Sequence, residues 1–208
     1  MFEKVQVSQF EVTNIVHIKN ALDTDTCKEV VRQVLAYKER TPPSPDTSEN
    51  CWRGDPHTNG GLTEEINLRL RDLIAEGYEL FQSTMPPPKT FATAEGIKKQ
   101  YNIDDPRISA WFNVNSSNGG NMIHIHAGSY LSGCLYFQST ATGYIEYYTQ
   151  NYLYKNMHPC WPYFGSAKYY PEDGDLILFP SYLAHYVQPN PSIRQRINMA
   201  FNVEINKK

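Results

Sequence analysis

The second half of this chain is a succession of short strand-like runs. From Ile108 onward, runs rich in Val, Ile, Tyr and Phe alternate with clusters of Gly, Asn, Ser and Pro. This alternation is typical of strands joined by turns. We expect strands at residues 108–114, 121–126, 130–138, 142–149, 166–170, 175–180, 184–188 and 196–204. A series of short strands separated by turn signals predicts a β-sandwich or a barrel.

The first third of the chain is predicted to be helical. Segment 21–40 opens with Asp23 and Thr24 as candidate caps, and its apolar residues follow one face of a 3.6-residue period. A second amphipathic helix begins near residues 63–65 and ends before the prolines of segment 85–88. Together with the strands, these helices predict a β-sandwich backed by helices.

Composition excludes several classes of function. The chain has 208 residues and a net charge of −3, a size that suits one domain. Without a basic bias, nothing indicates nucleic-acid binding. The N-terminal residues lack the apolar stretch of a secretory signal, and no apolar run approaches the roughly 20 residues needed to cross a membrane. We therefore expect a soluble, cytoplasmic protein. The four cysteines are scattered and are expected to stay unpaired in a reducing compartment.

Three histidines and an arginine are candidates for a functional site. His124 and His126 stand two residues apart on a predicted strand, so their side chains share one face. For this pair alone, two polar residues on a solvated strand are an alternative interpretation. His185 follows a fully apolar strand, however, and Arg196 comes eleven residues later. Neutral imidazoles suit iron, zinc, copper and nickel, so a metal site beside an anion-binding arginine is indicated.

The order and spacing of these blocks resemble a known family. The resemblance covers about residues 111–203 and rests on five motifs, which are Trp111-x-Asn113, the block from His124 to Tyr136, Gly143, the block from Gly174 to His185, and the block from Arg196 to Asn202. In these motifs the chain resembles a small branch of the 2-oxoglutarate- and Fe(II)-dependent oxygenases. The resemblance implies a mainly β fold with N-terminal helices around a double-stranded β-helix, or cupin-like jelly-roll, core.

The resemblance also implies how the domain and its site are organised. Residues 1–208 would form a single oxygenase domain, in which 1–107 supply helical support and first strands and 108–208 the jelly-roll core with the metal site. His124 and His185 would bind Fe(II). Arg196, aided by Tyr136, Asn198 and Ser132, would bind 2-oxoglutarate. Arg194 is a rival to Arg196, but the apolar alternation after Arg196 matches the family pattern better.

The chain departs from most of the superfamily at the third metal ligand. Most members carry a carboxylate two residues after the first histidine, where this chain has His126. Three arrangements are open: His126 is the third ligand, His126 lies outside a site of two histidines and water, or Glu146 reaches in from the next strand. We favour the first, because side chains two residues apart on a strand point the same way. All three histidines are thus candidate catalytic residues.

The implied reaction consumes O2 and 2-oxoglutarate, gives succinate and CO2, and hydroxylates a substrate through a ferryl species. The substrate, a small molecule or a peptide, is not identified by the sequence, and a homodimer is possible. Two other functions stay open: a cupin-like three-histidine metalloenzyme without 2-oxoglutarate, and a non-catalytic jelly-roll binding module. The tyrosine-rich segment 144–170 is interpreted as a packed insertion, or alternatively as a lid over the metal. Trp111 is expected in the core, and Asp173 and Asp175 in a turn.

Overall fold

The computed structural model describes residues 4–10, 13–44, 50–54, 61–84, 106–148 and 166–205. Two helices and eleven strands lie within these ranges. In chain order they are β1 (Lys4–Phe10), β2 (Thr13–Lys19), α1 (Thr24–Lys38), β3 (Cys51–Arg53), α2 (Glu64–Thr84), β4 (Arg107–Asn115), β5 (Asn121–His124), β6 (Leu131–Gln138), β7 (Ile145–Tyr148), β8 (Ser166–Tyr169), β9 (Leu176–Pro180), β10 (Ala184–Val187) and β11 (Arg196–Glu204).

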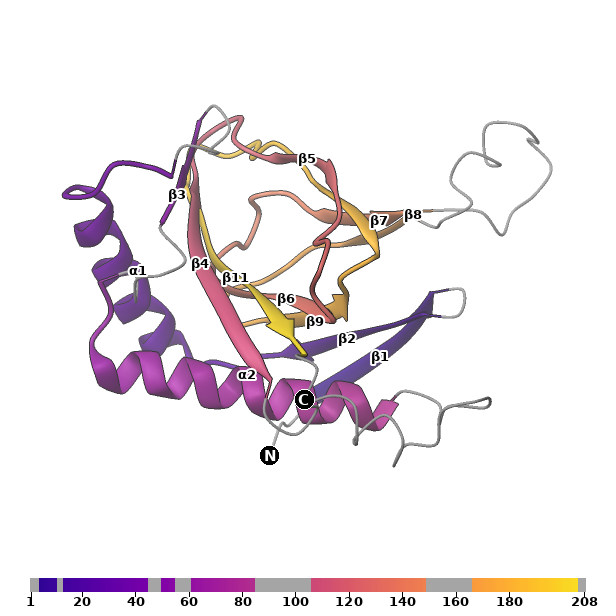
Figure 1. Ribbon diagram of the computed structural model, residues 1–208. Coiled ribbons are helices and arrows are strands. Elements are labelled where there is room, and N and C mark those ends of the chain that lie inside the picture. The colour runs from indigo at the N-terminus through magenta and orange to yellow at the C-terminus, as the bar shows by residue number, and fades with distance from the viewer. Residues whose placement is uncertain are drawn as a thin grey trace, which may run out of the picture.

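The strands form two antiparallel sheets. The larger sheet has the order β1-β2-β9-β6-β11-β4-β3, and the smaller has the order β5-β10-β7-β8. Figure 1 shows both helices along the outer side of the larger sheet, while β5, β7 and β8 lie across from its inner side. This is the predicted helix-backed arrangement of two sheets, and all eight strands predicted from residue 108 onward are present.

Side-chain alternation on the larger sheet separates two apolar clusters. Along β11, Ile197, Met199 and Phe201 pack toward the helices in the larger cluster. Arg196 and Asn198 occupy the intervening positions, so they face the smaller sheet. A smaller cluster fills the space between the sheets and includes Phe179 and Tyr147. The inner face of the larger sheet therefore combines apolar packing with polar side chains.

Helix α1 begins at the predicted cap and packs through the predicted face. Asp23 is the N-cap residue, and its carboxylate accepts a hydrogen bond of 2.8 Å from the Thr26 backbone N–H. Cys27, Val30 and Val34 are buried against the sheet. The observed helix, Thr24–Lys38, is shorter than the predicted segment 21–40. Among the described residues, neither helix combines the length and apolarity that crossing a membrane requires.

The helical interpretation of the first third did not locate three strands there, although first strands were expected within residues 1–107. β1 and β2 pair as a hairpin, β2 also pairs with β9, and β3 extends the other edge of the sheet. In β2, Ile15 and His17 face the smaller sheet while Val16 and Ile18 face the helices, so all four residues are buried. A strand buried on both faces shows no polar and apolar alternation. With three residues, β3 is too short to show a period.

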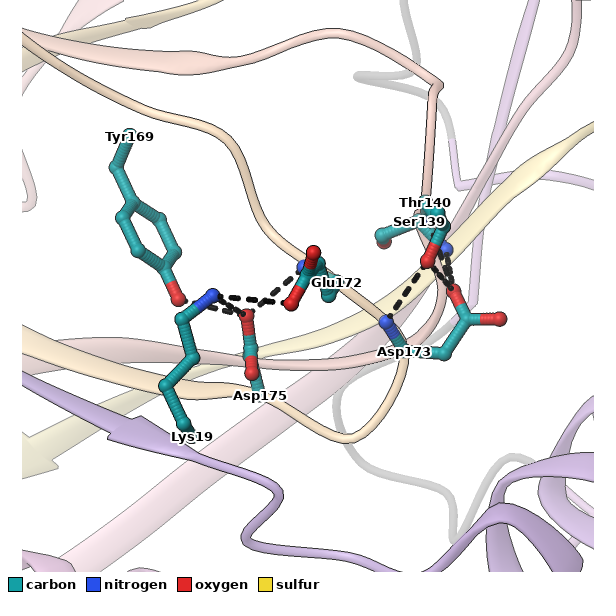
Figure 2. A network of polar contacts seen from close by, with 7 residues as sticks. All are labelled: Lys19, Ser139, Thr140, Tyr169, Glu172, Asp173 and Asp175. Atoms are coloured by element: carbon teal, nitrogen blue, oxygen red, sulfur yellow. Dashed lines mark hydrogen bonds and ion pairs between the residues drawn. The ribbon is translucent and has the colours of Figure 1, made fainter. Parts of the chain in front are cut away.

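A network of polar contacts ties the turn before β9 to the N-terminal hairpin (Figure 2). The Asp175 side chain is fully buried, and its Oδ2 accepts from Lys19 Nζ at 2.8 Å, Tyr169 Oη at 2.7 Å and the Glu172 backbone N–H at 2.8 Å. In the same turn, Asp173 accepts from the backbone N–H groups of Ser139 and Thr140. Both aspartates lie in the predicted turn, and each also anchors a distant strand or loop.

Replacing Asp175 by alanine should destabilise the protein strongly. The change leaves a half-buried tyrosine hydroxyl and a backbone N–H without their acceptor, and it removes the counter-charge of Lys19. We expect the free energy of unfolding to fall by about 3 kcal/mol in urea titrations at neutral pH. Asp25→Ala is the matched control, because Asp25 is exposed and pairs only with the exposed Lys28. Equal losses in both variants would contradict a special role for the buried carboxylate.

Candidate metal centre

The three histidines meet where β5 and β10 pair. His185 on β10 lies opposite His124 on β5 in the antiparallel register. His126 follows two residues after His124, and its backbone N–H donates to the Ser181 carbonyl at 2.9 Å. Strand β5 ends at His124, so the prediction of a strand through 126 was wrong. The Ser181 bond nevertheless holds His126 so that its ring lies beside the other two.

The imidazoles are close enough to share one metal ion. One nitrogen from each ring lies within 4.8 Å of the others. The Nε2 atoms of His126 and His185 are 3.3 Å apart, and the ring centroids of His124 and His185 are 4.2 Å apart. A metal about 2.1 Å from each of three nitrogens holds them roughly 3 Å apart. Small side-chain movements would therefore complete such a site.

Backbone carbonyls orient two of the rings. Nδ1 of His124 lies 2.7 Å from the Met122 carbonyl, and Nδ1 of His185 lies 2.9 Å from the Leu183 carbonyl. A carbonyl can only accept, so each Nδ1 carries the proton and donates it. This tautomer leaves the Nε2 lone pair of each ring free to bind a metal, the arrangement that ligand histidines in proteins use. The donor set therefore fits a divalent transition metal.

Burial keeps two of the imidazoles neutral. Desolvation, together with the neighbouring His124, lowers the pKa of His185 to about 3. Desolvation also lowers the pKa of His126 to about 4, with smaller contributions from His124 and Arg53. A neutral imidazole is the form that binds metals. Both rings are thus ready to bind a metal at physiological pH without first losing a proton.

Glu146 does not reach the histidines. On β7, Tyr147 pairs with His185, so these two side chains share the inner face and Glu146 points to the other face. There the Glu146 carboxylate accepts from the hydroxyls of Tyr148 and Ser166. Of the three arrangements open from the sequence, the one with Glu146 as a ligand is excluded by this geometry. Within the described ranges, the only cluster of potential metal ligands is His124, His126 and His185.

A hollow between the sheets opens beside the histidines. Its walls include all three rings, Tyr136, Asn198 and several apolar side chains. Asn113 donates from Nδ2 to Asn198 Oδ1 at 3.0 Å, which leaves the Asn198 amide group as a donor. Burial raises the pKa of Tyr136 well above its usual range, so its hydroxyl stays protonated. Tyr136 and Asn198 thus both line the hollow beside the histidines, and their contacts to the co-substrate stay a prediction.

The Ser132 hydroxyl has two partners within the protein, and its predicted role in 2-oxoglutarate binding stays a prediction. The hydroxyl contacts Ser181 Oγ and Asn202 Oδ1, both at 2.8 Å, and Ser132 is absent from the lining of the hollow. Trp111, in contrast, was expected in the core but lines the hollow, with its ring centroid 5.9 Å from that of His126. Asn113 and Asn121 also line the hollow. Their position beside the motif residues is the sequence signal that could have identified them.

Arg196 is buried behind the hollow and holds three carbonyl groups. Nη1 donates to Thr142 O at 3.0 Å, and Nη2 donates to Gln188 O at 3.1 Å and Gly119 O at 3.3 Å. Nε is buried without a partner. Burial lowers the pKa of the guanidinium from its high ordinary value. Its rival Arg194 is exposed and pairs with Asp173 at 2.8 Å, so only Arg196 faces the interior.

A fourth described histidine, His17, is buried on β2 with its ring centroid 4.2 Å from that of Tyr169. Desolvation and the charge of Lys19 lower the pKa of His17 to about 4, although the charge of Asp175 raises it. As pH falls, His17 therefore binds a proton near pH 6.5 in the unfolded chain but only near pH 4 in the folded chain. Stability is lost as pH falls through this window.

His17→Phe should remove this pH dependence. The free energy of unfolding of the native protein, relative to the variant, should fall by about 3 kcal/mol between pH 7 and pH 4. Urea titrations of both proteins across that range measure the difference, and the shared titration of the other histidines cancels. A difference that stays constant with pH would contradict the assignment. His57 and His158, which the sequence left without a role, lie outside the described residues, as does most of the tyrosine-rich segment 144–170.

Comparison with known proteins places this geometry in context. No curated protein matches the chain significantly. Residues 109–202 match the family described as "Putative 2OG-Fe(II) oxygenase". This segment contains most of β4 and of β11 and all strands between them, and with them every histidine of the candidate site and Arg196.

Several solved structures share the fold. A prolyl-4-hydroxylase of Pseudomonas putida is 12% identical with a TM-score of 0.60, and 91% of each chain is covered. HygX from Streptomyces hygroscopicus, solved with nickel and 2-oxoglutarate, is 12% identical with a TM-score of 0.60, covering 94% of this chain and 84% of HygX. A prolyl hydroxylase from Trichoplax adhaerens, bound to a hypoxia inducible factor peptide fragment, is 16% identical with a TM-score of 0.56, covering 91% and 83%. These likenesses confirm the predicted double-stranded β-helix.

Proposed function

We propose that this chain is a hydroxylase whose iron is held by His124, His126 and His185. The premise is that the chain belongs, through residues 109–202, to the 2-oxoglutarate- and Fe(II)-dependent oxygenase family. The observation that carries this proposal is the convergence of three imidazoles on one point, with Nε2 of two rings freed by backbone carbonyls. His126 then takes the place of the carboxylate that most of the superfamily uses.

The chain also offers a site for the co-substrate. We propose that Arg196 binds the carboxylate of 2-oxoglutarate that lies far from the metal, and that Tyr136 and Asn198 contribute hydrogen bonds. The buried Nε of Arg196, which has no partner, supports this proposal, because its N–H is free to donate a charge-assisted hydrogen bond to a carboxylate oxygen. The three carbonyls on Nη1 and Nη2 fix the orientation of the guanidinium before any ligand binds.

The residues around the site would serve the reaction by orientation and exclusion of water. When bound, Fe(II) and 2-oxoglutarate supply the oxidising chemistry, in which O2 and 2-oxoglutarate give succinate, CO2 and a hydroxylated substrate. His185 is held rigidly, since its ring packs against Phe179 with a centroid distance of 4.8 Å and its Nδ1 is anchored. Ile145 lines the apolar side of the hollow, and Tyr147 packs in the same apolar cluster. Together they would limit the access of water.

A second candidate is a cupin-like metalloenzyme that uses the same three histidines without 2-oxoglutarate. One observation favours it: among the described residues the site has no carboxylate ligand, because Glu146 is turned away. In that case Arg196 would only brace the carbonyls of the surrounding loops. The two candidates differ in whether 2-oxoglutarate binds next to the metal, and this difference can be measured directly.

The test is anaerobic addition of Fe(II) and 2-oxoglutarate to purified metal-free protein, followed by absorption spectroscopy in the visible range. We expect the weak charge-transfer band of an iron-bound 2-oxo acid, and release of succinate once O2 is admitted. Tight Fe(II) binding without the band would contradict the co-substrate assignment and favour the cupin-like candidate. Absence of both would leave a binding module as the better account.

Four further properties stay predictions. The protein would use O2 and a substrate that is a small molecule or a peptide, and it would act in the cytoplasm as one domain, with a homodimer as a possible assembly. Relatives of this fold include prolyl hydroxylases, but a shared fold is a weak reason for a shared substrate.

A further inference from the structure

Arg53 lies at the edge of the site and faces its interior. It is the last residue of β3, the edge strand of the larger sheet, and pairs with Asn113 on β4. Paired residues of neighbouring strands project from the same face of a sheet. Since Asn113 lines the hollow beside the histidines, the Arg53 side chain leaves the sheet on the site side. The sequence analysis gave this residue no role.

The Arg53 guanidinium rests on an aromatic ring that itself belongs to the site. Its central carbon lies 4.7 Å from the centroid of the Trp111 ring. Trp111 in turn lines the hollow and lies 5.9 Å from His126, measured between ring centroids. Arg53, Trp111 and His126 thus form a continuous row from the sheet edge to the candidate metal. Stacking on an aromatic face orients a guanidinium and leaves its N–H groups available at the rim.

No carboxylate neutralises Arg53 within the described part of the chain. Three other arginines, Arg32, Arg69 and Arg194, each pair with an acidic side chain. Arg53 makes no such ion pair there, and its Nε is buried without a hydrogen-bond partner. A buried donor without an acceptor costs stability. Proteins tolerate such a cost where a ligand supplies the missing acceptor, and this makes Arg53 a candidate for ligand binding.

The charge balance of the site points to an anionic ligand. This step rests on the proposed function. Imidazoles bind a metal as neutral ligands, so the charges of Fe(II) and of the 2-oxoglutarate dianion cancel. Among the described residues, Arg196 and Arg53 then remain as two positive charges without an acidic partner. A carboxylate ligand in place of His126 would have offset one of them. Partly buried like charges repel each other, so a negative charge on the substrate would be stabilised at this position.

We propose that Arg53, supported by Trp111, binds a carboxylate group of the substrate, so that the protein acts on a carboxylate-bearing molecule. The planar fork of the guanidinium gives such a carboxylate two parallel hydrogen bonds and a fixed orientation. The substrate would then lie across Trp111 with its reacting carbon toward the histidines. The carboxylate belongs either to a small organic acid or to an acidic side chain of a peptide, and the two sources share this chemistry.

The test uses the full chain loaded with Zn(II) and 2-oxoglutarate, which fills the metal and Arg196 sites without turnover. Two probes are titrated: N-acetylglycine, with a terminal carboxylate, and acetyl-Ala-Asp-Ala-amide, with a side-chain carboxylate. Binding is followed by the NMR signal of the Arg53 Nε–H, which Arg53→Lys assigns by its loss. We expect that signal to shift with at least one probe, and not with N-acetylglycinamide or acetyl-Ala-Asn-Ala-amide. The probe that binds more tightly identifies the source.

Variants separate a binding role from a structural one. Arg53→Gln should lower the affinity for the carboxylate probe by at least about tenfold, because a charge-assisted hydrogen bond is lost. It should leave the affinity for 2-oxoglutarate unchanged. Arg53→Lys keeps the charge but lacks the fork, so its affinity for the carboxylate probe should lie between those of the native protein and Arg53→Gln. Arg32 is exposed and ion-paired, and Arg32→Gln should bind the probe as the native protein does. Loss of 2-oxoglutarate binding in Arg53→Gln, or carboxylate and amide probes that bind equally, would overturn the proposal.

Failure of the proposed function would be visible separately. If the native protein takes up no 2-oxoglutarate, the co-substrate assignment is wrong, and the charge argument goes with it. The same titration of the zinc form then still tests Arg53 directly. If the Arg53 signal shifts with a carboxylate probe, and Arg53→Gln weakens the binding of that probe, a carboxylate site at Arg53 is supported. No shift with either carboxylate probe, in either form, would overturn it.

Discussion

His185→Ala is expected to abolish tight Fe(II) binding. His185 is the most buried of the three histidines, and its Nε2 is 3.3 Å from that of His126. Even the residues that merely orient a metal ligand contribute about 10- to 100-fold to affinity, so loss of a ligand should cost more than about 100-fold. Anaerobic titration with Fe(II), read by calorimetry, measures the change, and the charge-transfer band with 2-oxoglutarate should disappear.

Two companion variants make this result specific. Glu146→Gln changes a nearby acidic side chain that faces away from the histidines, so its Fe(II) affinity should match that of the native protein. Circular dichroism of metal-free His185→Ala must show a folded protein, and His185→Gln serves if alanine destabilises the interior. If His185→Ala is folded and binds Fe(II) as tightly as the native protein, the histidine cluster is not the metal centre.

Arg196→Ala is expected to abolish binding of 2-oxoglutarate while Fe(II) still binds. The guanidinium is the only described cation buried in the interior beside the hollow, with one N–H free for a carboxylate. Loss of a charged hydrogen-bonding partner that is already oriented should weaken the binding of 2-oxoglutarate by at least about 100-fold. The same change strips three carbonyls of their donors, so the free energy of unfolding should also fall by about 3 kcal/mol.

The affinity and the stability can be separated. Arg196→Lys keeps a cation and some of the carbonyl contacts, so it should fold better than alanine and yet bind 2-oxoglutarate weakly, because lysine lacks the planar fork. Arg194→Ala is the matched control. It removes an exposed arginine that pairs with Asp173, and the co-substrate affinity should stay within about twofold of the native value. Equal losses in Arg194→Ala and Arg196→Ala would contradict the assignment of Arg196.

The strands of the second half could be predicted because their local pattern matches their environment. β11 alternates between residues that pack on the helices and residues that face the smaller sheet, and this period of two is visible in the sequence. β2 could not be predicted in this way, because both of its faces are buried. The histidine pair was predicted from strand geometry, although β5 ends at His124 and a backbone bond to Ser181 places His126.

Contacts between distant segments explain what the sequence could not predict at the site. Arg53 approaches Trp111 only because β3 pairs with β4, and a strand of three residues carries no periodic signal. The choice between Arg194 and Arg196 depended on which side chain faces the interior, and the β4 register and the surrounding carbonyls decide it. Ser132 was assigned by resemblance alone, while its partners Ser181 and Asn202 come from two other segments.

The most direct test of the account is a crystal structure of the protein prepared anaerobically with Fe(II) and 2-oxoglutarate, with the metal located by its anomalous scattering. The account predicts one iron ion with Nε2 of His124 and His185 and a ring nitrogen of His126 about 2.1 Å away. It also predicts a 2-oxoglutarate carboxylate on Arg196. An iron ion bound by only two histidines, with His126 turned away and water in its place, would contradict the three-histidine centre.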